Sequence, residues 1–204
     1  MSETGYPVPA RLHRVEETIQ RSRFLTTVAR APTDIEARTV LNGVREEFPD
    51  ATHHCWAFIA GPPGSTLSVG MSDDGEPHGT AGRPMLTTLL HSGIGEIMAV
   101  CTRWYGGTNL GTGGLSRAYS GGVKLALESL PLDRKVERAM MEVEVGYPQV
   151  DGLQKLLAEL DSRVEREQYG GRVLYEVAVP EALVPRLQRG IADLTAGEGR
   201  VRRL

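Results

Sequence analysis

The sequence predicts an α+β protein made of two domains. Its 204 residues are enough for one large domain or two small ones. Strand-like and helix-like patterns follow one another along the chain, and from residue 137 they take the order β-α-β-β-α-β of a ferredoxin-like sandwich. The segment Pro-Leu-Asp-Arg-Lys at 131–135 separates this order from what precedes it. We therefore expect one domain at 1–133 and a ferredoxin-like domain at 137–204.

The first domain is expected to combine strands with three helices. Thr33 or Asp34 can cap a helix that runs to about Glu47, because both side chains accept hydrogen bonds from a first helical turn. Gly-Pro-Pro-Gly is a turn signal between two later strands. The expected elements are strands at 12–17 and 23–29, the capped helix, strands at 54–60 and 66–71, a polar loop at 72–80, a helix entered at Gly79 or Thr80 and closed at Ser92 and Gly93, a strand at 96–103 and a helix at 114–130.

The second domain shows clearer periodicity. Between Ala139 and Val145 apolar and acidic residues alternate, which is typical of a strand with one buried face. Four leucines at helical spacing follow within 150–160, so this segment is expected to be an amphipathic helix. The remaining expected elements are strands at 163–168 and 172–179, a helix at 181–194 and a last strand at 199–204.

The composition excludes several classes of protein. With 40% hydrophobic and 24% charged residues, the chain resembles an ordinary soluble domain. A net charge of −3 argues against coating of nucleic acid by the whole surface, although a local basic patch stays open. Two distant cysteines do not form a disulfide scaffold. No apolar run is long enough to span a bilayer and the N-terminal residues lack a secretion signal, so we expect a cytoplasmic protein without a membrane partner.

A glycine-rich segment follows the strand at 96–103 and holds five glycines within nine residues. A strand, a glycine-rich turn and a helix N-terminus make a natural anion site, because unpaired N–H groups and the helix dipole point outward together. Arg117 and Lys124 fall on one face of the following helix. Alternatively, the glycines only permit close packing and the cations are solvated. The candidate phosphate- or nucleic-acid-binding residues are Arg83, Arg103, Trp104, Tyr105, Gly106, Gly107, Thr108, Gly111, Gly113, Gly114, Arg117 and Lys124.

The standard nucleotide motifs are absent from this segment. Gly106 and Gly111 have the spacing of the Walker glycines, yet Thr112 stands where that motif needs lysine. Ser116 occupies the place of the third glycine of a dinucleotide fingerprint. Trp104 or Tyr105 could stack on a base, although strand alternation places Arg103 and Trp104 on opposite faces and one of them in the core.

The polar loop at 72–80 carries a second candidate site. Asp73, Asp74 and Glu76 are three carboxylates within four residues, a set that could hold Mg²⁺. A solvated acidic turn would have the same composition. Asp74 or Glu76 could instead cap the next helix or accept hydrogen bonds from Arg83, Arg103 or Arg117. The histidines and cysteines at 53–55, 78, 91 and 101 give only a weak indication of zinc binding or of a Cys–His nucleophile.

Two long motifs carry a family resemblance. Residues 72–84, Ser-Asp-Asp-Gly-Glu-Pro-His-Gly-Thr-Ala-Gly-Arg-Pro, and residues 102–119, Thr-Arg-Trp-Tyr-Gly-Gly-Thr-Asn-Leu-Gly-Thr-Gly-Gly-Leu-Ser-Arg-Ala-Tyr, resemble the YigZ/IMPACT family. The resemblance implies a first domain similar to the second domain of ribosomal protein S-five, with its β-α-β fold. It implies a second domain similar to the last domain of the ribosomal translocase. Both parallels suggest contact with RNA or the ribosome, and a eukaryotic relative regulates translation.

We therefore expect a regulatory, translation-associated factor without enzymatic activity, whose partner is RNA, a ribosomal component or a translation-related protein. No catalytic residue is predicted. The alternative is a Mg²⁺-dependent protein or enzyme that binds a nucleotide or phosphate ester, with the metal on the acidic loop and the phosphate on the glycine-rich loop. An adaptor that binds another protein is a third interpretation.

Overall fold

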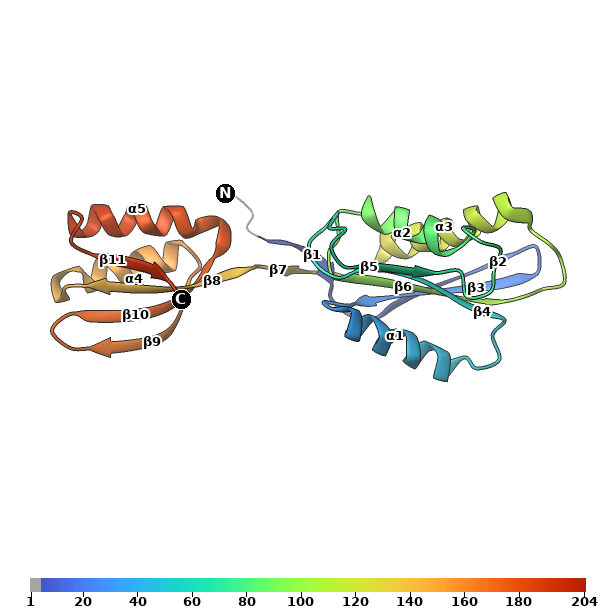
Figure 1. Ribbon diagram of the computed structural model, residues 1–204, viewed down its shortest axis with the longest axis horizontal. Helices are drawn as coiled ribbons and strands as arrows, with labels where there is room; N and C mark the ends of the chain where they lie inside the picture. Colours follow the sequence, from blue (N-terminus) through green and yellow to red (C-terminus); the bar gives the residue numbers. More distant parts are fainter. Residues whose placement is uncertain (1–4) are drawn as a thin grey trace. The chain divides into compact units, whose positions relative to one another are not determined.

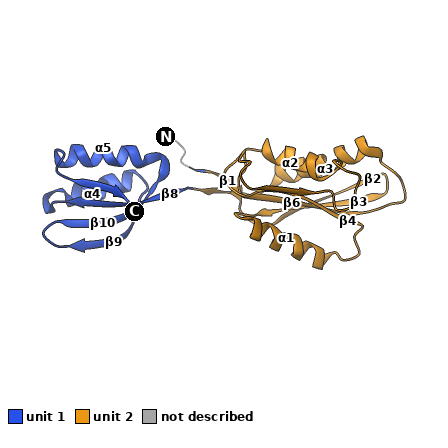
Figure 2. Ribbon diagram, viewed as in Figure 1, with its two compact units in different colours: residues 1–5, 136–204 blue, residues 6–135 orange. Residues whose placement is uncertain are grey.

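The computed structural model describes residues 5–204, which form two compact units. Residues 6–135 make the N-terminal unit, and residues 136–204 with Gly5 make the C-terminal unit (Figure 2, orange and blue). The expectation about a secretion signal falls partly on residues 1–4, which lie outside the described residues. Among residues 5–204, no helix has the length and apolar character needed to cross a membrane. The mixed α+β class predicted from the sequence is confirmed.

The N-terminal unit is built on a five-stranded antiparallel sheet with strand order β2-β3-β6-β4-β5. Helix α1 covers one face and helices α2 and α3 cover the other (Figure 1). Apolar side chains fill both layers, so the central strand β6 is buried almost throughout. The elements are β2 (His13–Ile19), β3 (Ser22–Arg30), α1 (Asp34–Glu47), β4 (His53–Ile59), β5 (Val69–Ser72), α2 (Gly82–Leu90), β6 (Ile97–Trp104) and α3 (Gly111–Ser129).

Two short strands of the N-terminal unit were not predicted from the sequence. The segment expected to be only a domain boundary contains β7 (Leu132–Lys135), which pairs antiparallel with β1 (Tyr6–Pro9). Pro7 and Pro9 conceal the strand, because proline cannot donate to a ladder and is confined to edge strands, strand starts and bulges. Lys135 and Arg30 also form ion pairs with the buried carboxylate of Glu96, which fastens β7 to the main sheet.

The C-terminal unit has the predicted element order and an antiparallel sheet with strand order β11-β8-β10-β9. Alternate residues of β8, among them Met141, Val143 and Val145, are buried beneath two helices. The two glutamates between them are half-buried on the other face. The elements are β8 (Arg138–Val145), α4 (Val150–Glu159), β9 (Arg163–Tyr169), β10 (Val173–Pro180), α5 (Val184–Thr195) and β11 (Arg200–Arg203), with single 3-10 turns at Tyr147–Gln149 and Glu181–Leu183 before the two helices.

Candidate functional site

The acidic loop between β5 and α2 is folded by its own carboxylates. Asp73 accepts hydrogen bonds from the backbone N–H groups of Gly79, Ala81 and Gly82, at 2.8, 3.0 and 2.9 Å. These groups lie at or just before the start of α2, so it is Asp73, rather than Asp74 or Glu76, that caps this helix. Burial raises the pKa of Asp73, but the three N–H donors outweigh it and the net pKa lies below the usual value.

Asp74 connects the loop to the other face of the sheet. Its two carboxylate oxygens accept from the Arg45 guanidinium and from the backbone N–H of His54, both at 2.7 Å. The backbone carbonyl of Asp74 lies 2.8 Å from Nδ1 of His53. Asp74 therefore holds the loop against β4 and α1.

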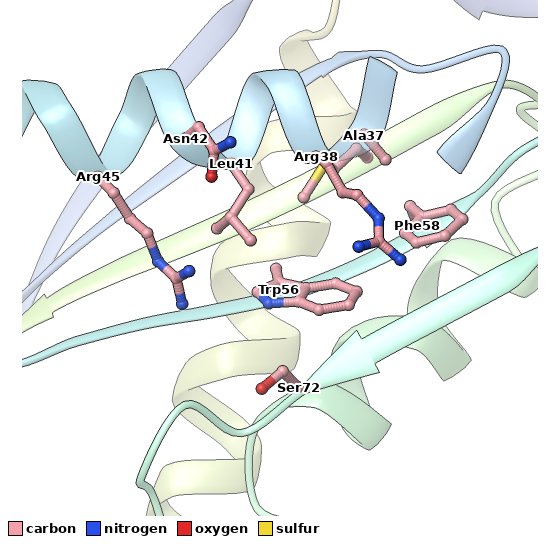
Figure 3. A pocket seen from close by; sticks show the side chains of 9 residues that line it. Ala37, Arg38, Leu41, Asn42, Arg45, Trp56, Phe58 and Ser72 are labelled. Atoms are coloured by element: carbon pink, nitrogen blue, oxygen red, sulfur yellow. The ribbon is translucent and has the colours of Figure 1, made fainter. Parts of the chain in front are cut away.

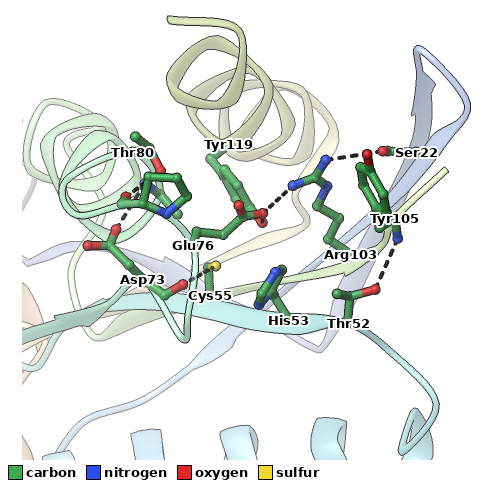
Figure 4. Close-up of polar contacts among 12 residues, drawn as sticks. Ser22, Thr52, His53, Cys55, Asp73, Glu76, Thr80, Arg103, Tyr105 and Tyr119 are labelled. Carbon is green, nitrogen blue, oxygen red and sulfur yellow. Dashed lines mark hydrogen bonds and ion pairs between the residues drawn. The ribbon is translucent and has the colours of Figure 1, made fainter. Parts of the chain in front are cut away.

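Glu76 points inward and joins the two sequence motifs (Figure 4). Its Oε1 atom accepts from Nη1 of Arg103 at 2.5 Å and from the Tyr119 hydroxyl at 2.6 Å. Nη2 of Arg103 in turn donates to the Ser22 hydroxyl at 3.2 Å. The Glu76 and Arg103 side chains are only 4% and 5% exposed. Of the alternatives from the sequence, hydrogen bonding between Glu76 and Arg103 is the one seen.

This arrangement gives the predicted Mg²⁺ site no support. The carboxylates of Asp73, Asp74 and Glu76 bind three different sets of protein donors and do not converge. Among residues 5–204, no group of three or more His, Cys, Asp or Glu side chains could hold a metal ion. The spacing in the sequence was suitable, but side-chain direction in a folded loop is set by contacts that spacing does not reveal.

Arg103 and Trp104 also have partners within the fold. Arg103 was predicted to engage phosphate, but it is buried and ion-paired, so its guanidinium positions Glu76 instead. Trp104 donates from Nε1 to Asp50 at 2.9 Å. Its ring lies under the Arg23 guanidinium and edge-to-face with Phe48. Only Tyr105, which is 47% exposed, keeps an aromatic ring at the surface of this segment.

The glycine-rich segment combines a tight contact with a helix start. A Cβ on Gly106 would lie 2.0 Å from the backbone oxygen of Arg21, so only glycine fits there. Helix α3 begins at Gly111, three residues before the predicted start, and therefore includes Gly113 and Gly114. Gly107 and Gly111 have positive φ angles of 80° and 70°. The close-packing interpretation thus explains part of the cluster.

The loop and the start of α3 border a cleft of about 480 Å³. No side chain caps α3, and its first turn holds no acidic residue. Gly107 and Gly113 are exposed and Thr108 and Gly114 are half-buried, but none of these four predicted residues lines the cleft. The cleft is lined by Thr52, His53, Glu76, Pro77, Arg103, Tyr105, Asn109, Leu110, Gly111, Thr112 and Leu115.

Three other predicted residues meet in a separate groove, here called the α2–α3 groove. Arg83 on α2 and Arg117 and Lys124 on α3 are exposed and border the same space of about 460 Å³. Within the described chain, no ion pair involves any of the three. The groove is lined by Gly79, Arg83, Pro84, Thr87, Thr88, Ser116, Arg117, Ser120 and Lys124.

The two cysteines are structural. Cys55 donates from Sγ to the Asp73 carbonyl at 3.0 Å, and Cys101 accepts from the Thr26 hydroxyl at 3.6 Å. Both are fully buried, which raises the pKa of Cys55 and raises that of Cys101 to about 12. A raised pKa disfavours the thiolate form that a nucleophile needs, so the structure gives the Cys–His nucleophile no support. Sequence reasoning missed Tyr119 and Ser22 in the buried network, although a tyrosine at a core-facing helix position signals the need for a hydrogen-bond partner.

Both units match known sequence families. Residues 20–127 match the Impact N-terminal domain, and residues 143–198 match a domain of unknown function, DUF1949. The chain is 44% identical over 190 residues to the IMPACT family member YigZ of Escherichia coli (strain K12), covering 93% of each sequence. It is 38% identical over 192 residues to an IMPACT family member of Haemophilus influenzae, covering 94% of this chain and 93% of that protein.

A solved structure extends the match to three dimensions. The crystal structure of a hypothetical protein is 41% identical in sequence and aligns with a TM-score of 0.70. The alignment covers 99% of this chain and 98% of the other. The similarity therefore includes both units.

Proposed function

The chain belongs to the IMPACT family, and on that premise we propose that it is a non-enzymatic, translation-associated factor that binds RNA through the α2–α3 groove. The observation that carries the proposal is the convergence of Arg83, Arg117 and Lys124 from two helices. Exposed cations without acidic partners attract phosphate, and each contact releases counterions from the nucleic acid. Such contacts fix the position of a backbone without reading its sequence.

The groove offers cationic contacts more than hydroxyl donors. The hydroxyls of Thr87, Thr88 and Ser120 donate to backbone carbonyls of their own helices. Their hydrogens are therefore not directed at a ligand. A polyanion fits this chemistry better than a neutral polar ligand. Since the whole chain has a net charge of −3, the groove is a local feature and not part of a basic surface.

RNA is the polyanion favoured by the resemblance of both domains to ribosomal and translocase domains. The alternative enzyme needs Mg²⁺ on the acidic loop, and the carboxylates of Asp73, Asp74 and Glu76 are bound by the protein's own donors. The geometry therefore supports RNA binding better than metal-dependent chemistry on a phosphate ester.

A binding experiment with matched variants tests the proposal. We expect Arg117→Ala/Lys124→Ala to weaken binding of a labelled single-stranded RNA by about tenfold at low salt, because two phosphate contacts are lost. Fluorescence anisotropy measures the dissociation constant.

The control is Lys155→Ala/Arg189→Ala, which removes one lysine and one arginine from exposed helix positions of the C-terminal unit. We expect this control to bind like the unchanged protein. Equal binding by both double variants, or no RNA binding by the unchanged protein, would contradict the proposal.

A further inference from the structure

We propose that the cleft between α1 and β4 holds one nucleotide of a single-stranded RNA, with its base stacked on Trp56. The inference rests on the proposed function, since it concerns RNA recognition by the same unit. The cleft lies under α1, on the face of the sheet opposite the α2–α3 groove, and would be a second contact region for the RNA. The cleft has a volume of about 430 Å³, within the range of ligand pockets. It is lined by Ala37, Arg38, Leu41, Asn42, Arg45, Trp56, Phe58, Ser72 and Met98 (Figure 3).

The floor of the cleft is an aromatic platform. Trp56 and Phe58 are alternate residues of β4 and therefore share one face of the sheet. Their rings are stacked, with centroids 5.9 Å apart and planes at 15°. Phe58 is buried, whereas Trp56 is only half-buried. Trp56 thus borders the open part of the cleft.

A glycine on the edge strand makes room for this platform. Gly70 of β5 pairs with Phe58, and a Cβ at this position would lie 2.4 Å from Cε1 of Phe58 and 3.0 Å from Cζ3 of Trp56. Both rings therefore lie against the backbone of β5. Helix α1 stands over the cleft without filling it.

The other wall of the cleft is cationic. Arg38 and Arg45 extend from α1 toward β4, on either side of Leu41 (Figure 3). Their separation of seven positions corresponds to about 10 Å along the helix axis. Arg45 is held by Asp74 at 2.7 Å, whereas within residues 5–204 no ion pair involves Arg38.

These features together define the ligand. A flat aromatic floor favours a flat ring, because bases stack on aromatic side chains. Arg38, which has no ion pair within residues 5–204, favours a phosphate on one side of the ring. On the other side Arg45 donates to Asp74 from Nη2, so its remaining N–H donors are the ones available to a second phosphate. A nucleotide within a strand has a phosphate before and after its base, whereas a free nucleoside monophosphate has only one. A base in a duplex is already stacked and paired, so the occupant belongs to a single strand.

We place the base stacking that the sequence suggested for Trp104 on Trp56 instead. The ring of Trp104 contacts Arg23 and Phe48 within the protein. Trp56 instead has its stacking partner on one side and the cleft beside it.

Tryptophan fluorescence tests the inference, because Trp56 and Trp104 are the only tryptophans in the chain. In Trp104→Phe, emission reports on Trp56 alone. We expect saturable quenching by a short single-stranded adenylate RNA, and at least about tenfold weaker quenching by adenosine monophosphate. Arg38→Ala should shift the RNA titration to higher concentration, whereas the control Arg189→Ala should not.

Substitution of the ring gives an independent readout. In anisotropy, Trp56→Leu should weaken RNA binding by about 5- to 100-fold, and Trp56→Phe should retain most of the affinity because it keeps a ring. Thermal unfolding shows whether each variant folds; if Trp56→Leu does not, Arg38→Ala and Trp56→Phe carry the test.

The possible results separate the two proposals. RNA binding that depends on Arg117 and Lys124 but neither quenches Trp56 nor responds to Trp56→Leu would overturn this inference and leave the proposed function standing. Quenching by adenosine monophosphate as strong as that by RNA would overturn the assignment to a strand. Absence of RNA binding by the unchanged protein would overturn both.

Discussion

The two units use polar residues in opposite ways. Among residues 5–204, the charged residues that are buried, Glu76, Glu96 and Arg103, all belong to the N-terminal unit. The polar residue buried in the C-terminal unit is Thr195. Ion pairs of the C-terminal unit lie at its surface, as between Arg202 and Glu142, whose side chains are 71% and 17% exposed. The N-terminal fold therefore depends on a buried polar network, and the C-terminal fold on apolar alternation.

The difference shows what the family motifs do. Several motif residues that look like ligands in the sequence, such as Asp73, Glu76 and Arg103, hold loops and helices in place. The α2–α3 groove and the cleft under α1 are two of the surfaces open to a ligand. Two other motif residues, Arg83 and Arg117, border the α2–α3 groove. The motifs thus contribute both to internal contacts and to the surface that we propose binds RNA.

The two units should differ most in how much stability each loses when one of its ion pairs is broken. Arg103→Ala should lower the free energy of unfolding by about 3–5 kcal/mol, because it leaves the Glu76 carboxylate buried without its cation. Arg202→Ala should leave the denaturation midpoint unchanged, because its ion pair is exposed. Denaturant titration of the full chain measures both variants.

A double substitution sharpens this contrast. Glu76→Gln/Arg103→Met removes both charges, so it should be more stable than Arg103→Ala. If Arg103→Ala were no more destabilising than Arg202→Ala, the buried network would not support the N-terminal fold.

The next contrast lies within helix α3. A Cβ on Gly122 would lie 2.5 Å from Oγ1 of the buried Thr26, whereas a Cβ on Gly121 meets nothing within 4 Å. We expect Gly122→Ala to destabilise by about 1–3 kcal/mol through overpacking. Gly121→Ala should stabilise by about 0.5–1 kcal/mol through helix propensity. Thermal unfolding distinguishes the two, and a Gly122→Ala variant as stable as Gly121→Ala would show that the contact with β3 is not tight.

In the C-terminal unit, a glycine-to-alanine substitution in a helix should cause a smaller loss of stability. A Cβ on Gly190 of α5 would lie 2.6 Å from Cδ2 of Leu156, the flexible end of a side chain. Gly190→Ala should therefore be milder than Gly122→Ala.

The smallest expected effect is the dependence of the fold's stability on pH. Burial raises the pKa of Asp73, but the three N–H donors lower it by more, so its native pKa lies below the ordinary 3.8. A carboxylate with a lowered pKa stabilises the fold above its unfolded pKa, and this contribution is lost as the pH falls through the native pKa. Asp73→Asn should cost about 1 kcal/mol at neutral pH, as for loss of a helix cap.

The same variant should also lose less stability than the unchanged protein on acidification from about pH 6 to about pH 3. Thermal unfolding across this range measures the difference. Asp193→Asn, an exposed carboxylate on α5, is the control. Parallel pH profiles for the unchanged protein and Asp73→Asn would show that the cap does not depend on ionisation.

Local patterns could be predicted from the sequence, and long-range pairings could not. Helix α1 begins after Thr33, whose side chain accepts from the N–H of Glu36, as its cap signal indicates. The alternation in β8 likewise identified the buried face of the C-terminal sheet. Pairing of β1 with β7 joins segments more than 120 residues apart, and prolines weakened the signal of the first strand.

The candidate site shows the same limit. Arg117 and Lys124 could be placed on one helix face from their spacing, but the position of Arg83 opposite them depends on how α2 packs on α3. Likewise, nothing local indicates that Glu76 would turn inward to Arg103, 27 residues later. The aromatic platform was visible only as two rings at alternate positions, a pattern that most strands of a core share.

The proposed binding of RNA by Arg83, Arg117 and Lys124 is tested most directly by the salt dependence of affinity. The logarithm of the association constant falls linearly with the logarithm of the salt concentration. This slope should become shallower by about 0.7 for each lost contact to a single strand. Arg117→Ala/Lys124→Ala should therefore show a slope shallower by about 1.4 than the unchanged protein, and Lys155→Ala/Arg189→Ala should show no change. Identical slopes for all three proteins would contradict RNA binding in the α2–α3 groove.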